Sequence, residues 1–402
     1  MMNPGLKHLQ SYPFERLAKL RESTIAPKHI NPINMSIGEP QAPTPKFIQM
    51  ALIDAIAGTG KYPSTRGSES LRVAIVKWLS TRFKIPAESI DHERNVIPVN
   101  GTREALFSIA QCLIDPSQPT PTVAMPNPFY QIYEGAALLA GAQPFYIPCL
   151  SENNFLPTFE SVSAKTWDAC QLVYICTPGN PSGRVMDMTQ IGDLIDLADR
   201  HNFIIVSDEC YSELYLDEAK PPVGLLEVAA ALGRTDFHRC IAMHSLSKRS
   251  NAPGLRSGFV AGDADLIRSY LQYRTYHGSA MALHVQAASA AAWKDEAHVQ
   301  ENRRLNRERF RAVIPILKPY LDISEPDAGF YLWPLLQLDD VEFCRALIEE
   351  QNVITLPGRF LARSSVHGNP GKNRVRIVLT DKVDTCVEGA QRIATLLQQH
   401  SG

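Results

Sequence analysis

The chain has 402 residues, of which 45% are hydrophobic and 20% are charged, and its formal net charge is −2. Because this length exceeds what one ordinary hydrophobic core accommodates, two domains are expected. The near-neutral balance, with Lys and Arg spread along the chain, excludes a polybasic nucleic-acid binder and an acidic tail protein.

The first 21 residues mix polar and apolar side chains with prolines and do not resemble a signal peptide. No segment reaches the roughly 18 uninterrupted apolar residues that a membrane helix needs. The eight cysteines form no close C-x-x-C pair, which predicts reduced, buried thiols. We therefore expect a cytoplasmic protein that binds no membrane, no nucleic acid and no metal.

From about residue 65 onward, short apolar runs alternate with helical patterns. One helix is predicted by five apolar residues that share a face at helical spacing: Leu71, Ala74, Ile75, Trp78 and Leu79. A second helix is predicted at Asp187–Arg200. Strands are predicted at Asn95–Val99, Thr122–Met125, Gln171–Cys176, Phe203–Ser207 and Cys240–His244. This alternation predicts an α/β domain around a mainly parallel sheet.

From about Ala280 to Lys318, a stretch rich in alanine and in charged residues predicts one or two long helices. A shorter mixed region follows, with strands predicted at Phe330–Trp333, Val353–Leu356 and Val375–Leu379. We interpret this region as a smaller α+β domain. The expected division is a large α/β domain at 46–283 and a small domain formed by 1–45 and 284–402, which includes the N-terminal segment and an interdomain helix.

Polar residues follow three of the predicted strands: Asn180 comes after the third, Asp208 and Tyr211 after the fourth, and Lys248 after the fifth. Because the carboxyl ends of parallel strands face one crevice, these side chains are expected to meet there. The turn at 101–103, between the first strand and the next helix, offers backbone N–H groups to an anion. Each residue alone is explained by a turn, a helix cap or a solvated charge, and only their combination indicates a site.

With these residues the chain resembles the fold-type I, pyridoxal 5′-phosphate (PLP)-dependent aminotransferases of class I/II. The resemblance extends from Ser36–Pro40 to Arg374–Ile377 and therefore covers nearly the whole chain. Its most specific part is Ser245–Lys248 followed by Gly254–Gly258. The family implies a fold-type I transferase, with a large domain built on a mainly parallel sheet and a smaller α+β domain.

The resemblance also implies a role for each residue of the crevice. Lys248 would carry PLP as a Schiff base and move the substrate proton, and Asp208 would keep the pyridine nitrogen protonated. Tyr211 and Asn180 would hydrogen-bond the phenolic oxygen, and Tyr130 would stack on the ring. The catalytic residues expected from the family are therefore Lys248, Asp208 and Tyr211.

The PLP phosphate needs several donors. The donors that the resemblance implies come from several places in the chain. They are the Gly101 turn with the backbone N–H groups of Thr102 and Arg103, the hydroxyls of Ser245 and Ser247, the guanidinium of Arg256, and the hydroxyl of Tyr62, which would reach across from a partner subunit. The last of these implies a homodimer with shared active sites.

The substrates implied are small amino and keto acids. Arg376 would clamp the substrate α-carboxylate, with Gly38 and Asn180 beside it. Arg249 and Asn251 are candidates for an outer pocket, but packing around the cofactor loop explains both of them better.

The expected reaction is transamination between glutamate/2-oxoglutarate and an amino or keto acid. The segments Asn3–Leu17 and Lys248–Gly258 resemble N-succinyldiaminopimelate aminotransferases, which implies N-succinyl-LL-2,6-diaminopimelate as the substrate, in lysine and diaminopimelate biosynthesis. An aspartate or aromatic aminotransferase and a carbon–sulfur β-lyase would use the same residues and stay open. A non-catalytic PLP-sensing domain is disfavoured, because residues 1–32 leave no room for a helix-turn-helix module and no basic patch exists.

Overall fold

The computed structural model describes residues 2–366 and 368–400. Its largest sheet has seven strands in the order β2-β8-β7-β6-β5-β3-β4. Within the described ranges, β8 runs antiparallel to β2 and β7, and the other neighbours pair in parallel. The predicted mainly parallel sheet is therefore confirmed. The strands are β2 (Val96–Val99), β3 (Thr122–Asn127), β4 (Gln143–Pro148), β5 (Cys170–Cys176), β6 (Ile204–Asp208), β7 (Cys240–Ser245) and β8 (Gly258–Gly262).

Helices cover both faces of this sheet. In β5, Val173 and Ile175 enter one hydrophobic core while Leu172 and Tyr174 enter another, because successive side chains of a strand point to opposite faces. The first core is completed by α2 (Lys46–Asp54), α3 (Glu69–Arg82), α7 (Met188–His201), α8 (Leu225–Ala231) and α11 (Leu283–Lys294). The second is completed by α4 (Thr102–Leu113), α5 (Ile132–Leu139) and α10 (Ala264–His277).

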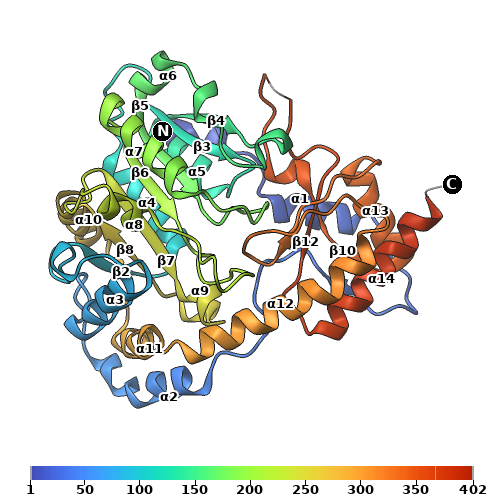
Figure 1. Cartoon of the computed structure of the whole chain (residues 1–402), viewed down its shortest axis with the longest axis horizontal. Coiled ribbons are helices and arrows are strands. Elements are labelled where there is room, and N and C mark those ends of the chain that lie inside the picture. The colour runs from blue at the N-terminus through green and yellow to red at the C-terminus, as the bar shows by residue number, and fades with distance from the viewer. Residues whose placement is uncertain (1, 367, 401–402) are drawn as a thin grey trace.

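A separate core gathers the rest of the chain around two small sheets, which are drawn on the right of Figure 1. One sheet has the order β11-β12-β9, and in the other β1 pairs in parallel with β10. The strands are β1 (Ile33–Asn34), β9 (Tyr331–Leu332), β10 (Val353–Ile354), β11 (Leu356–Pro357) and β12 (Val375–Val378). The helices are α1 (Pro13–Glu22), α12 (Ala297–Leu317), α13 (Asp340–Gln351) and α14 (Val383–Gln399).

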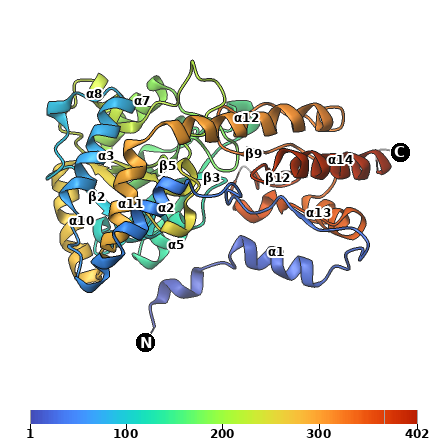
Figure 2. The same cartoon turned by 90° about the horizontal axis from the view of Figure 1, so that it is seen from below.

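The long helix α12 connects the two parts, as Figures 1 and 2 both show. Residues from both ends of the chain share the second part: Leu17 and Ile33 pack in one core with Val353 and Ile393. The helix α11 contributes Trp293 to the core of the seven-stranded part. The division at 46–283 stays a prediction.

Two strands of the large sheet, β4 and β8, have no counterpart among the predicted strands. The strand β4 has Pro144 near one end and Pro148 at the other, and its sequence therefore did not indicate a strand. A proline is tolerated there because β4 lies at the edge of the sheet. The strand β8 begins at Gly258, the last residue of the Gly254–Gly258 segment that carries the family resemblance, and ends at Gly262.

Short helices complete the chain. They are α6 (Ala164–Ala169), α9 (Leu246–Arg249) and the 3-10 helices η1 (Pro4–His8), η2 (Ile56–Gly60), η3 (Ala87–Ser89), η4 (Ser151–Asn153), η5 (Phe159–Ser161), η6 (Pro253–Leu255) and η7 (Gly358–Leu361). Over the described residues, none of the helices combines the length and apolar character that crossing a membrane requires.

Candidate active site

The carboxyl ends of the parallel strands open into one pocket of about 540 Å³, which we call the strand-end pocket. The sheet order places β5, β6 and β7 side by side, so the residues that follow them meet there as predicted. The predicted site residues that line it are Gly38, Thr102, Arg103, Tyr130, Asn180, Asp208, Tyr211, Ser245, Ser247, Lys248, Arg256 and Arg376.

Lys248 lies on the short helix α9, directly after β7. Its Nζ donates to the carbonyl of Gly38, and its own carbonyl accepts a hydrogen bond of 3.0 Å from Asn302 on α12. Burial lowers the pKa of Lys248 to about 8, and the cations Arg376 and Arg103 act in the same direction. A large share of this amine is therefore neutral near pH 8 and can act as a nucleophile or base.

Asp208 is the last residue of β6 and is only 4% exposed. Its Oδ2 accepts a hydrogen bond of 2.7 Å from Tyr133, and its Oδ1 accepts one of 3.3 Å from the amide of Cys210. Over the described residues it has no cation partner within ion-pair distance. Burial raises the pKa of Asp208, so the site favours a ligand that brings a proton or positive charge to this carboxyl group.

Arg376 is buried on β12 and reaches the strand-end pocket from the smaller part of the chain. Its Nη1 donates to Oδ1 of Asn180 at 3.0 Å, and its Nη2 donates to the carbonyl of Ser36 at 2.8 Å. Its Nε is buried and has no acceptor among the described residues. The guanidinium therefore retains donor capacity that a carboxylate ligand would satisfy.

Tyr211 is buried, and its hydroxyl lies 2.8 Å from the hydroxyl of Tyr331 on β9. The sequence analysis did not single out Tyr331, which also lines the strand-end pocket. The position was included in the strand predicted at Phe330–Trp333, but no local signal separates a pocket tyrosine from a core tyrosine. Tyr331 also restricts position 38 to glycine, because a Cβ at Gly38 would collide with the Tyr331 hydroxyl.

Backbone and side-chain donors collect where β2 turns into α4. Gly101 has a φ of +82°, and a Cβ at that position would collide with the guanidinium of Arg256. The N–H groups of Thr102 and Arg103 begin α4, where no intrahelical acceptor exists, and among the described residues no other acceptor contacts them. This turn is therefore a site for an anion.

Hydroxyl groups at the start of α9 complete this donor set. Ser245 caps α9 by accepting from the amide of Ser247, and the two hydroxyls lie 2.9 Å apart. Arg256 donates at 2.9 Å to the carbonyl of Pro253, and no carboxylate pairs with it within the described ranges. Its positive charge remains available to an anion in the pocket.

Arg103 also directs its side chain to the pocket, a feature that the sequence analysis did not anticipate. Its Nε donates at 2.6 Å to the hydroxyl of Tyr130, and its Nη2 donates at 3.5 Å to the hydroxyl of Tyr12. Tyr12 and Phe14 bring the N-terminal segment to the pocket wall. Over the described chain, this guanidinium has hydroxyl partners but no carboxylate partner.

Three further candidates lie away from these contacts. The side chain of Tyr62 is fully exposed and does not line the strand-end pocket of its own chain. Arg249 is 1% exposed and pairs with Glu296, which agrees with the packing explanation. Asn251 is partly buried, and its carbonyl accepts from Thr44.

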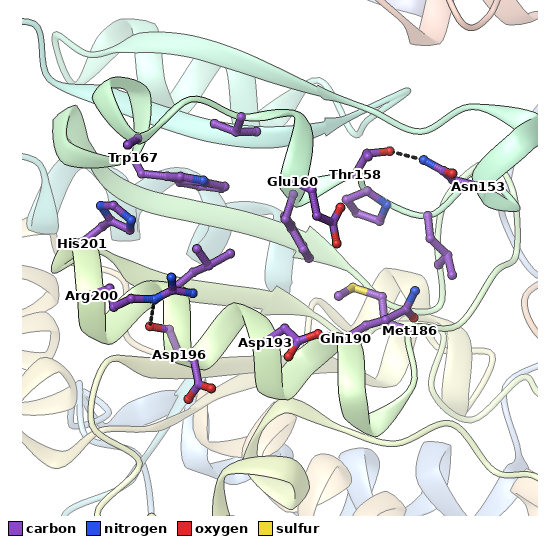
Figure 3. A pocket seen from close by; sticks show the side chains of 16 residues that line it. Asn153, Thr158, Glu160, Trp167, Met186, Gln190, Asp193, Asp196, Arg200 and His201 are labelled. Carbon is purple, nitrogen blue, oxygen red and sulfur yellow. Dashed lines mark hydrogen bonds between the residues drawn. The ribbon is translucent and has the colours of Figure 1, made fainter.

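A second hollow, of about 670 Å³, lies between α7 and the segment 153–167 (Figure 3). Its apolar walls include Trp167 and Met186, and its acids include Glu160, Asp193 and Asp196. No lysine and none of the predicted site residues is among the described residues that line it. The chemistry is therefore assigned to the strand-end pocket.

Comparisons with known proteins agree with this geometry. Residues 30–393 match the family model for aminotransferase class I and II. The LL-diaminopimelate aminotransferase of Maridesulfovibrio salexigens is 31% identical, over 97% of this chain and 98% of the relative. An aminotransferase structure from Neisseria meningitidis is 47% identical with a TM-score of 0.93, over 98% of this chain and 100% of that one. A probable N-succinyldiaminopimelate aminotransferase from Thermus thermophilus is 25% identical with a TM-score of 0.83, over 95% and 98%.

Proposed function

The chain belongs to the family of class I and II aminotransferases, which depend on PLP, and from that premise we propose that it transfers an amino group between glutamate/2-oxoglutarate and a diaminopimelate-type acid. One observation carries this proposal: Lys248, Asp208 and Arg376 line the same pocket. Lys248 has a lowered pKa, and among the described residues Asp208 is a buried carboxyl group without a cation partner and Arg376 has a buried N–H without an acceptor.

The pocket residues fit PLP. The pyridinium N–H of the cofactor would give Asp208 the cationic partner that this buried carboxyl group lacks. The phosphate would accept from the first N–H groups of α4, from the hydroxyls of Ser245 and Ser247, and from Arg256. Lys248 lies in the same pocket, where its amine would bind the cofactor covalently.

Bound PLP supplies an electron sink for the substrate carbon that loses its proton. The released Nζ of Lys248 would take the proton from the substrate Cα, since its lowered pKa leaves the amine partly neutral. Arg376 would anchor the α-carboxylate and so orient the Cα–H bond toward this amine. Asp208 would hold the proton on the pyridine nitrogen, while Tyr211 and Asn180 would donate to the phenolic oxygen. Tyr130 would cover the ring face.

The distal end of the substrate needs a second set of polar partners. Arg103 offers a cation that no carboxylate pairs with in the described part of the chain, and Glu39 places a carboxylate on the same pocket wall. The expectation from sequence is N-succinyl-LL-2,6-diaminopimelate, whose distal carboxylates would pair with Arg103. Glu39 favours a second candidate, free LL-diaminopimelate, because its distal ammonium group would find an acid there. The name of the Maridesulfovibrio salexigens relative supports the same candidate.

The substrate class is testable with 2-oxoglutarate as the common acceptor. We expect kcat/KM for at least one of the two diaminopimelate donors to exceed that for aspartate or phenylalanine at least about tenfold, or roughly 1.4 kcal/mol of transition-state discrimination. Glutamate formation, followed with each donor in turn, measures the ratio. The ratio between the two diaminopimelate donors then separates the succinylated from the free substrate.

Arg103→Gln is the matched probe for the distal contacts, because glutamine retains polarity without the positive charge. It should raise KM for the diaminopimelate donors more than KM for alanine, which has no distal carboxylate. A higher kcat/KM for aspartate or phenylalanine in the wild-type enzyme would overturn the diaminopimelate assignment. Pyruvate and ammonia released from cystathionine, without glutamate formation, would instead indicate a β-lyase.

The fully exposed side chain of Tyr62 supports a shared site in a two-fold dimer. We expect a mixture of inactive Lys248→Ala chains with inactive Tyr62→Ala chains to regain up to one wild-type site per heterodimer, because both lesions would fall in one site and leave the other site intact. Activity is measured after the chains are mixed and exchanged, with each variant alone as the control. A wild-type protein that stays fully active as a dilute monomer would contradict the shared site.

A further inference from the structure

Tyr133 on α5 lies behind the strand-end pocket and is fully buried. Its ring stacks on Tyr174 with a centroid separation of 4.7 Å and an interplanar angle of 10°. It also meets Tyr130 edge to face, at 5.8 Å and 89°. Two rigid aromatic neighbours therefore fix the position of the Tyr133 hydroxyl.

The hydroxyl of Tyr133 donates to Oδ2 of Asp208 at 2.7 Å. Burial raises the pKa of Tyr133 well above its ordinary value, so the phenol keeps its proton and remains a donor. The other oxygen, Oδ1, accepts from the amide of Cys210 at 3.3 Å, and the thiol of Cys210 also hydrogen-bonds to this carboxyl group. The carboxyl group therefore has one oxygen held by a short bond and one with capacity to spare.

We propose that Tyr133 is a positioning residue, which holds Oδ2 of Asp208 so that Oδ1 keeps a lone pair directed at the ring nitrogen of the cofactor. This inference rests on the proposed role of Asp208. The hydroxyl has a second effect, because its hydrogen bond stabilises the ionised carboxylate and opposes the rise in pKa that burial causes. Tyr133 thereby connects the residue expected to cover the ring face, Tyr130, with the residue expected to hold the ring nitrogen.

Tyr133→Phe tests the inference, since it keeps the stacked ring and removes only the hydroxyl. In the apoenzyme we expect the pKa of Asp208 to rise by about one unit, or about tenfold in proton affinity. The carboxyl stretch in infrared difference spectra, assigned by subtraction of Asp208→Asn, measures this change. In the PLP-loaded enzyme we expect kcat to fall about tenfold with KM for glutamate little changed, because Arg376 is untouched. The ¹⁵N shift of labelled PLP should report a less protonated ring nitrogen.

Tyr174→Phe is the matched control. It also removes a buried tyrosine hydroxyl, which donates at 2.6 Å to the carbonyl of Leu106, and it leaves Asp208 untouched. Equal changes in both variants, or an unchanged Asp208 pKa in Tyr133→Phe, would overturn the positioning role. Wild-type turnover in Asp208→Asn would instead refute the proposed function of Asp208, so the two failures are distinguishable.

Discussion

Replacing Lys248 by alanine is expected to abolish turnover, with a loss in kcat of at least about a thousandfold. The reason is that one amine is assigned two tasks, the attachment of PLP and the transfer of the substrate proton. The lowered pKa of Lys248 and its place at the carboxyl end of β7 suit both. The yellow absorbance of the lysine-bound cofactor should disappear together with the activity.

Peptide mapping after borohydride reduction of the wild-type enzyme checks the assignment directly. The pyridoxyl group should be recovered on Lys248 and be absent from the same peptide of the variant. Lys77→Ala is the matched control, because Lys77 is exposed on α3 and should leave spectrum and turnover unchanged. Recovery of the label on any other lysine would refute the role of Lys248.

The second large effect is expected for Asp208→Asn. An amide cannot hold the ring nitrogen in its protonated form, so we expect kcat to fall about a hundredfold or more, on the order of 3 kcal/mol. PLP should still bind, because the donors assigned to its phosphate lie on α4, α9 and Arg256. Steady-state kinetics and the absorbance of the bound cofactor, measured on the same preparation, separate catalysis from binding.

Asp193→Asn makes the same chemical change on the exposed face of α7 and serves as the control. Asp193 lines the second hollow. Unchanged kinetics in Asp193→Asn would therefore also agree with the assignment of the chemistry to the strand-end pocket. Near wild-type turnover in Asp208→Asn would mean that another group supports the electron sink.

The sequence by itself determined the strands that carry the site. β2, β3, β5, β6 and β7 each lie within one or two residues of a predicted strand, because a short apolar run bounded by turn residues is a local signal. Once those strands were predicted, the residues that follow them were expected to share one site, because a parallel sheet directs the carboxyl ends of its strands to one edge. The family resemblance added Arg376 and Gly38, which strand ends alone do not indicate.

Only the tertiary structure decided which partners complete the site. Tyr133 meets Asp208 across 75 positions of sequence, and Tyr331 meets Tyr211 across 120. Such pairs depend on the order of the strands and on the packing of the two parts, and a buried tyrosine has the same local pattern wherever its hydroxyl points. The burial of Arg249 was decided in the same way, because its partner Glu296 comes from the segment before α12. Local patterns and the family resemblance thus indicated most of the residues that line the pocket, whereas long-range packing decided what each of them contacts and added Tyr331 to the pocket wall.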